Sequence, residues 1–410
     1  MRVRRVVITG MGAISPFGRG AEALVAALYA GRSGVVTFPD LGQVGGMRCR
    51  VAALVPQIDP LEIPRKFRRS MSALSIYATL AASDALTQAG LGEAARASGD
   101  MGVVLGSTIG SPGTIQEFFE DYLTDRSLER MRSTLFFQIM NHSGAANVAQ
   151  ALGITGRILA PSAACSTGCQ AVGYGYEMIA LGKQETMLCG GADEFHPLTA
   201  ATFDVMNAVS TGYNDRPSAT PRPFDRDRDG VVCAEGCGIL LLESLDSALR
   251  RGAMILAEIV GFACVTDTSN IANPNAESME RCMRLALHDA GVAAADVAYV
   301  NAHATATAQG DVAEAEAIHA VFGGDVPVSS LKGHIGHTMA ASGAIELIGT
   351  IAMMERGELI ATHNLDHVDP ACAMIRHARP RERREIGAAV KNNFALGGVN
   401  ASLVLRRYRA

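Results

Sequence analysis

Residues 161–175 read PSAACSTGCQAVGYG and place one cysteine, Cys165, among small residues directly before a helical pattern. A thiol at the N-terminus of a buried helix faces unpaired backbone N–H groups, which favour an anion. We therefore expect a stabilised thiolate with a lowered pKa. Considered alone, the pattern favours an inert buried cysteine, because free cysteine is among the most buried residue types.

The same organisation recurs later in the chain. Residues 165–183 and 336–357 both start with small residues and end in a glycine one helix later. Residues 82–108 and 284–305 each contain a helix that closes on an Ala-Gly pair, followed by a hydrophobic strand. Such similarity indicates a duplication. We expect two similar mixed or parallel sheets covered by helices, with the two equivalent helices meeting in the core.

Composition narrows the class of protein. A chain of 410 residues suggests two or three domains, or two fused halves. Its net charge of −5 argues against general nucleic-acid affinity. Nine cysteines without CxxC pairs indicate a reduced, cytoplasmic protein. The chain shows neither a signal-peptide pattern nor an apolar run of about 20 residues, so we expect no membrane span.

Three segments outside the helical repeats carry charge or aromatic residues. A basic cluster, Arg65, Lys66, Arg68 and Arg69, precedes a helical pattern and forms either a solvated face or a docking patch for an acidic partner. Residues 114–132 are polar and aromatic, which predicts an excursion outside the core sheet. Residues 213–230 are rich in Pro, Asp and Arg, and form either a surface loop or an internal salt-bridge network.

Three polar residues occupy corresponding ends of the predicted elements. Cys165 starts the first core helix, His303 ends the strand VAYVNAH, and His337 starts the second core helix. Strand ends and helix starts of α/β sheets are where ligands bind. A cysteine with histidines from separate segments is a nucleophile arrangement, because the histidines can stabilise a thiolate or donate protons.

Each of these residues also has a structural explanation. His303 alone could be a hydrogen-bonded core histidine. His334 and His337 could form a metal pair, but the carboxylates or thiols that would complete the site are missing. Lys332 could lie on the surface. Glu346 falls on an apolar helix, where a carboxylate is costly unless paired, and Lys332 is its obvious partner.

Motifs along nearly the whole chain resemble the β-ketoacyl-[acyl-carrier-protein] synthases of the condensing-enzyme (thiolase-like) superfamily. The elongating type I/II synthases are the most similar subgroup, since two histidines replace the histidine and asparagine of initiating synthases. The resemblance rests on RVVITGMGAISPFG, SAACSTG, STGYND, PRPFDRDRDGVV, NAHATAT, LKGHIGHTMAASGAIE and NNFALGGVNASLVL.

This resemblance implies an α/β fold, the thiolase-like duplicated α-β-α-β-α layered fold with two core mixed sheets. The N-terminal half would comprise residues 1–250, with the nucleophile and a cap excursion around residues 110–140. The C-terminal half would comprise residues 251–410, with the catalytic histidines.

The resemblance also implies roles for individual residues. Cys165 would be the acylated nucleophile, and His303 and His337 would drive decarboxylation of a malonyl thioester and stabilise the enolate. Lys332 and Glu346 would hold the second histidine in place. The remaining implied roles are contacts with the pantetheine arm (Thr305, Thr307), substrate binding and gating (Phe394, Leu396), an oxyanion hole (backbone N–H of Cys165 and Leu396) and carrier-protein docking (Arg65, Lys66, Arg69).

The implied reaction is a decarboxylative condensation of an acyl thioester with malonyl-acyl-carrier protein in fatty-acid elongation. It needs no metal and no redox cofactor. The implied partners are the carrier protein and a second copy of the chain. The alternative is a ketosynthase of a specialised polyene or polyketide pathway, in which an active synthase can pair with a non-catalytic chain-length partner. A degradative thiolase should have a second catalytic cysteine near the C-terminus, where this chain has NNFALGGVN.

Four positions depart from the family pattern. They are Ala304 after the first histidine, Ile335 before the second, and Ala395 and Leu396 in the closing motif. These departures leave the acyl-chain length and the pathway open.

Overall fold

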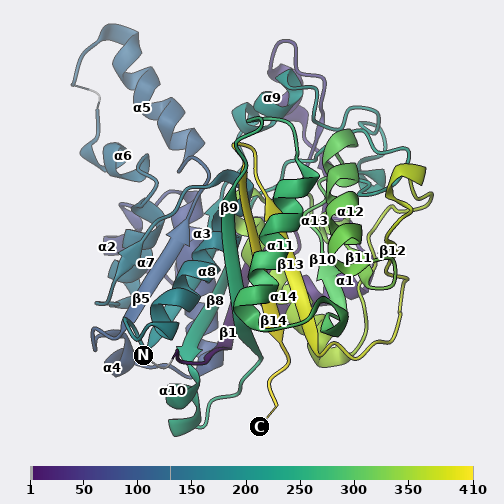
Figure 1. Cartoon of the computed structure of the whole chain (residues 1–410). Helices are drawn as coiled ribbons and strands as arrows, with labels where there is room; N and C mark the ends of the chain where they lie inside the picture. The colour runs from purple at the N-terminus through teal and green to yellow at the C-terminus, as the bar shows by residue number, and fades with distance from the viewer. Residues whose placement is uncertain (1–2, 130, 410) are drawn as a thin grey trace.

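The computed structural model describes residues 3–129 and 131–409 (Figure 1). Its strands are β1 (Val6–Ser15), β2 (Gly18–Arg19), β3 (Val36–Thr37), β4 (Val51–Ala52), β5 (Met101–Gly106), β6 (Ile158–Leu159), β7 (Thr186–Asp193), β8 (Gly236–Ser244), β9 (Ala257–Thr266), β10 (Tyr299–Asn301), β11 (Pro327–Ser329), β12 (Arg376–His377), β13 (Ala388–Phe394) and β14 (Val399–Arg406). The main sheet has 12 strands in the order β12-β11-β10-β13-β14-β9-β1-β8-β7-β5-β6, with β2 paired to β1. Strands β3 and β4 form a separate small sheet.

The main sheet consists of two halves with the same topology. The order β6-β5-β7-β8-β1 in one half matches β11-β10-β13-β14-β9 in the other. The pattern of parallel and antiparallel pairs is also the same in both. This repetition agrees with the duplication inferred from the sequence. The proposed boundary between residues 250 and 251 stays a prediction.

The two half-sheets are joined into one, whereas the sequence suggested two sheets. Residues 6–8 of β1 pair antiparallel with residues 257–259 of β9. The edge strand of a sheet leaves a row of backbone N–H and C=O groups without hydrogen-bond partners. Here β1 and β9, the first strands of the two halves, provide these partners for each other. The mixed α/β architecture itself is confirmed.

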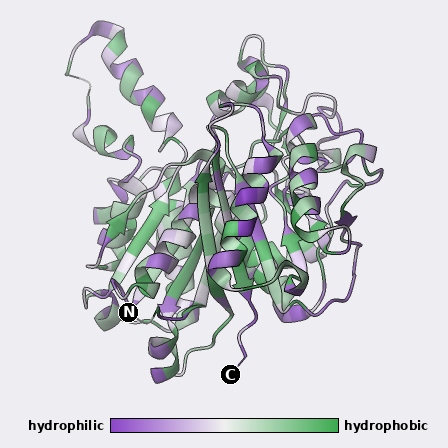
Figure 2. Ribbon diagram, in the orientation of Figure 1, coloured by the Kyte–Doolittle hydropathy of each residue, from purple (hydrophilic) through white to green (hydrophobic). Residues whose placement is uncertain are grey.

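Helices cover both faces of the halves and fill the space between them. The helices are α1 (Ala21–Tyr29), α2 (Arg65–Arg68), α3 (Ala73–Ala89), α4 (Glu93–Arg96), α5 (Pro112–Asp125), α6 (Ser133–Gln138), α7 (Ser143–Leu152), α8 (Thr167–Ala180), α9 (Pro197–Val205), α10 (Leu245–Arg250), α11 (Ala276–Ala290), α12 (Ala308–Phe322), α13 (Lys332–Ile335) and α14 (Ser342–Arg356). Helices α3 and α7 pack on the N-terminal half, α11 and α12 on the C-terminal half, and α8 and α14 lie centrally against strands of both (Figure 1). Hydrophobic residues concentrate in the strands (Figure 2).

The central helices α8 and α14 approach each other closely at their first turns. A Cβ on Gly168 would lie 2.4 Å from the Ala340 carbonyl oxygen, and a Cβ on Gly343 would lie 2.2 Å from the Cys169 nitrogen. Real Cβ atoms do not approach so closely, so both positions require glycine. The prediction that the two equivalent helices meet in the core is therefore confirmed.

The charged segment at residues 213–230 ties the two halves together. Arg222 pairs with Asp366 at 2.7 Å, and Arg228 pairs with Asp369 at 2.6 Å. The segment thus forms a salt-bridge network with the C-terminal half, which decides between the two explanations that the sequence left open.

Helices α5 and α6 project from the body of the molecule (Figure 1). They occupy the region where the sequence predicts an excursion outside the core sheet. Among the described residues, we find no helix with the length and apolar character that crossing a membrane requires.

Candidate active site

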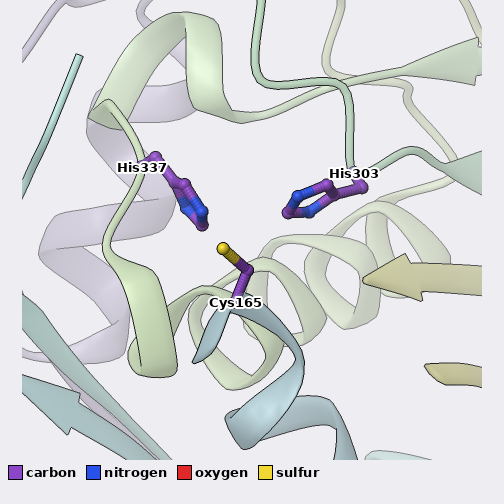
Figure 3. A group of neighbouring side chains, drawn as sticks. All are labelled: Cys165, His303 and His337. Carbon is purple, nitrogen blue, oxygen red and sulfur yellow. The ribbon is translucent and has the colours of Figure 1, made fainter. Parts of the chain in front are cut away.

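Cys165, His303 and His337 converge from three segments of the chain (Figure 3). The cysteine sulfur and one ring nitrogen of each histidine all lie within 4.8 Å of one another. The two imidazole rings are nearly perpendicular, at 82°, with centroids 5.3 Å apart. Three such groups can act together on one substrate carbonyl. A cysteine and two histidines could also bind a metal ion such as zinc.

Cys165 lies in a short 3₁₀ turn, Ala164–Ser166, directly before α8. Ala164 has a positive φ of 45°, a conformation that costs a non-glycine residue about 1–3 kcal/mol. The turn is held by the C-terminal half: the Ser166 hydroxyl donates to the Val399 carbonyl at 2.7 Å, and Asn393 Nδ2 donates to the Cys165 carbonyl at 3.1 Å. The strained turn presents the thiol at the start of the helix.

The electrostatic environment of Cys165 differs from the sequence-based expectation. Burial raises the pKa of its thiol to about 11, although Lys332 and the backbone N–H groups of Leu396 and Cys165 act in the opposite direction. The expectation of a lowered pKa was therefore wrong, because desolvation outweighs these stabilising groups. The two N–H groups are the donors expected to form an oxyanion hole.

Both histidines are buried and neutral. Burial is the largest cause that lowers the pKa of His303 and of His337 well below the usual value, and the charge of Lys332 lowers both further. Asn393 Nδ2 lies 3.4 Å from His303 Nδ1 but closer to the Cys165 carbonyl oxygen, at 3.1 Å, and to the Ser342 hydroxyl, at 3.0 Å. Within the described part of the chain, neither ring nitrogen of His337 has a hydrogen-bond partner.

Lys332 and Glu346 are fully buried next to the histidines. Lys332 Nζ lies 2.6 Å from Glu346 Oε1, so the pair that the sequence suggested is present in the structure and Lys332 is not a surface residue. The second carboxylate oxygen, Glu346 Oε2, lies 2.9 Å from Nζ of another buried lysine, Lys391.

A cavity of about 460 Å³ opens onto the three residues. Thr305 and Thr307 line it, and their hydroxyl oxygens are 3.3 Å apart. Phe394 lies buried in its wall, whereas Leu396 is 38% exposed. The four residues with an expected substrate role therefore lie at one cavity that leads to Cys165.

The departures from the family pattern lie around the same centre. Ala304, Ile335 and Ala395 are buried, and the Ala304 N–H donates to Glu314 at 2.6 Å. His334 is turned away from His337: its ring nitrogens contact two backbone carbonyls, and its ring stacks on His363. The metal pair weighed in the sequence is therefore not formed.

The basic cluster lies outside this centre. Arg65, Lys66 and Arg69 are exposed on and directly after the short helix α2. They present positive charge to solvent and do not line the cavity.

Comparison with known proteins identifies the family of the chain. The model described as "Beta-ketoacyl synthase, N-terminal domain" matches residues 3–248, and "Beta-ketoacyl synthase, C-terminal domain" matches residues 256–366. The chain belongs to the β-ketoacyl synthase family.

Several β-ketoacyl synthases are similar to this chain along its whole length. "3-Oxoacyl-[acyl-carrier-protein] synthase 1" of Escherichia coli K12 is 36% identical, over 99% of this chain and 100% of its own. The crystal structure of a β-ketoacyl synthase from Burkholderia phymatum is 45% identical with a TM-score of 0.96, over 99% and 100% of the two chains. "The ishigamide ketosynthase/chain length factor" is 32% identical with a TM-score of 0.90 and the same coverage.

Two residues at this β-ketoacyl synthase site were missed by the sequence analysis. Asn393 contacts the Cys165 carbonyl and His303, and Lys391 contacts Glu346. Both lie on β13, whose seven residues, Ala388–Phe394, are all buried. A lysine and two asparagines in a strand that reads AAVKNNF are the signal that could have revealed them, because buried polar groups require partners.

Proposed function

We propose that this chain catalyses the decarboxylative condensation of an acyl thioester with malonyl-acyl-carrier protein, yielding 3-oxoacyl-acyl-carrier protein in fatty-acid elongation. The observation that carries this proposal is the convergence of Cys165 with two neutral histidines at the end of one cavity. Acyl transfer requires a thiol nucleophile, and formation of a carbon–carbon bond requires a carbanion equivalent.

In the first half-reaction, the Cys165 sulfur attacks the carbonyl carbon of the acyl thioester. The thiol gives up its proton, and the carrier thiol leaves with one. The N–H groups of Cys165 and Leu396, which contact the sulfur in the empty site, would receive the carbonyl oxygen as it becomes negative. Such a donor contributes about 3–4 kcal/mol in related acyl transfers.

In the second half-reaction, His303 and His337 would donate hydrogen bonds to the thioester oxygen of the malonyl group. The bond between the malonyl α-carbon and the carboxylate breaks and CO2 leaves. The electron pair of that bond stays with the remaining thioester, which becomes an enolate. The enolate carbon then attacks the acyl group on Cys165, whose thiolate leaves and is reprotonated. A neutral imidazole can serve in this step, because it keeps one N–H group that donates to the oxygen.

Several residues would support these steps. The Lys332–Glu346 pair would position His337, and Thr305 and Thr307 would bind the pantetheine arm in the cavity that they line. Phe394 and Leu396 would shape the passage of the acyl chain. Because Leu396 stands where the family has a phenylalanine, the accepted chain length is left to measurement.

Intact mass tests the nucleophile. We expect the wild type to gain the acyl mass from acyl-carrier-protein thioesters, then to release CO2 and a product two carbons longer when malonyl-carrier protein is added. Cys165→Ala should gain no acyl mass, because it lacks the sulfur.

Cys237→Ala provides a matched control, since Cys237 is equally buried but lies in β8. It should be acylated like the wild type, and a chelator should change nothing. An acylated Cys165→Ala, or a wild type that never becomes acylated, would contradict the proposal.

The exposed basic residues Arg65, Lys66 and Arg69 would dock the acidic carrier protein. Replacing all three by glutamate should raise the KM for malonyl-carrier protein at least tenfold and leave KM for malonyl-pantetheine unchanged, because only the carrier carries the acidic surface. Steady-state kinetics with both substrates measures the difference. Equal KM values for the carrier substrate before and after replacement would place docking elsewhere.

We also propose that two copies of the chain associate. Helices α5 and α6 expose Phe119, Leu123 and Phe136 to solvent, and a second copy would cover them. Light scattering of the purified chain should give twice the mass of the monomer, and Leu123→Glu should shift it towards the monomer. A monomeric wild type would contradict a homodimer and would favour a different chain as the partner.

A specialised pathway is the second candidate. It is favoured by Ala304, Ile335, Ala395 and Leu396 around the site and by the similarity to a structure named as a ketosynthase with its chain length factor. The mass experiment distinguishes the two candidates: preferred saturated acyl groups would support fatty-acid elongation, whereas preferred polyenoic or polyketide groups would support the specialised pathway.

A further inference from the structure

Strand β13 carries a lysine in the middle of the protein. Lys391 is fully buried, and so are all of its neighbours from Ala388 to Phe394. Burying an ammonium group costs several kcal/mol unless it is paired and hydrogen-bonded. A buried lysine at this position therefore needs a partner of opposite charge, and its presence calls for a functional or structural explanation.

The partner of Lys391 is the carboxylate that already binds Lys332. Lys391 Nζ lies 2.9 Å from Glu346 Oε2, Lys332 Nζ lies 2.6 Å from Glu346 Oε1, and all three side chains are inaccessible to solvent. Lys391 Nζ also donates to the backbone carbonyl of Asn392. One carboxylate is thus shared by two lysine side chains, and Glu314 is the next carboxylate whose charge acts on them.

Both lysines act electrostatically on the two histidines. Lys332 and Lys391 both lower the pKa of His303 and of His337, in addition to the larger effect of burial. Burial raises the pKa of Glu314, whose carboxylate accepts the backbone N–H of His303, whereas both lysines lower it. The titratable groups around the histidines, taken from every neighbouring element, are Cys165, Asp193, Glu314, Lys332, Glu346 and Lys391.

We propose that Lys391 is a positioning residue of the condensation: it holds Glu346 from the side opposite Lys332 and supplies a second buried positive charge that keeps both imidazoles neutral. This inference rests on the proposed function. The same charge favours the enolate, which is the anion that forms between the histidines. Lys391 acts through Glu346 and through its field, and it does not touch the substrate.

Lys391→Met tests the charge, because methionine has a similar length and shape but no charge. Without the second ammonium, the histidines accept a proton more readily. We expect the acidic limb of the pH profile of malonyl decarboxylation to move to higher pH by about one unit. Where the pH lies below the wild-type limb, this shift gives a loss of kcat that approaches tenfold, with KM for malonyl-carrier protein unchanged.

Two further variants separate charge from packing. Lys391→Gln keeps a hydrogen-bond donor for Glu346 and should show the same shift as Lys391→Met. Lys183→Met, at an exposed lysine, is the matched control and should retain the wild-type profile. Thermal unfolding of each variant records any loss of stability independently of the pH profile.

The outcomes are distinct. A wild-type acidic limb in a folded Lys391→Met or Lys391→Gln protein, with only the melting temperature lowered, would make Lys391 a structural residue and overturn the inference. Failure of both variants to fold would do the same, since it would assign the lysine to the stability of the core. A wild type that does not decarboxylate malonyl-carrier protein would instead refute the proposed function.

Discussion

The close packing of α8 against α14 is the constraint on which the site depends. Glycines at the first turns of both helices let their backbones meet without room for a Cβ. Cys165 lies two residues before α8 and His337 five residues before α14, so this contact brings the two side chains within 4.8 Å of each other. The repeated strand order gives the two halves the same topology.

Burial then sets the chemistry. The imidazoles of His303 and His337 stay neutral because they are desolvated and lie near positive charge. The cost of burying that charge is offset only because Glu346 binds both lysines. Desolvation also raises the pKa of the Cys165 thiol and so opposes its ionisation. A water-filled site with the same residues would lack these properties.

The residues that could be predicted from the sequence are those with a local signal. The ends of the predicted elements identify Cys165, His303 and His337. A carboxylate in an apolar helix identifies Glu346, and the need of that carboxylate for a charged partner identifies Lys332. Asn393 and Lys391 have a weaker signal, the polar residues of AAVKNNF, which indicates a site only once β13 is known to be buried. The joining of the half-sheets and the raised pKa of Cys165 depend on long-range packing and complete desolvation, which local patterns do not encode. The functional roles of all these residues are proposals.

The central claim is that two neutral histidines share one site with the nucleophile. Nitrogen-15 NMR of histidine-labelled protein tests it most directly, with His303→Gln and His337→Gln used to assign the signals. Neutral imidazoles carry one protonated and one unprotonated nitrogen, and we expect that pattern for both residues at pH 7, because burial holds both pKa values well below the usual value. Imidazolium signals from either residue at pH 7 would contradict the account.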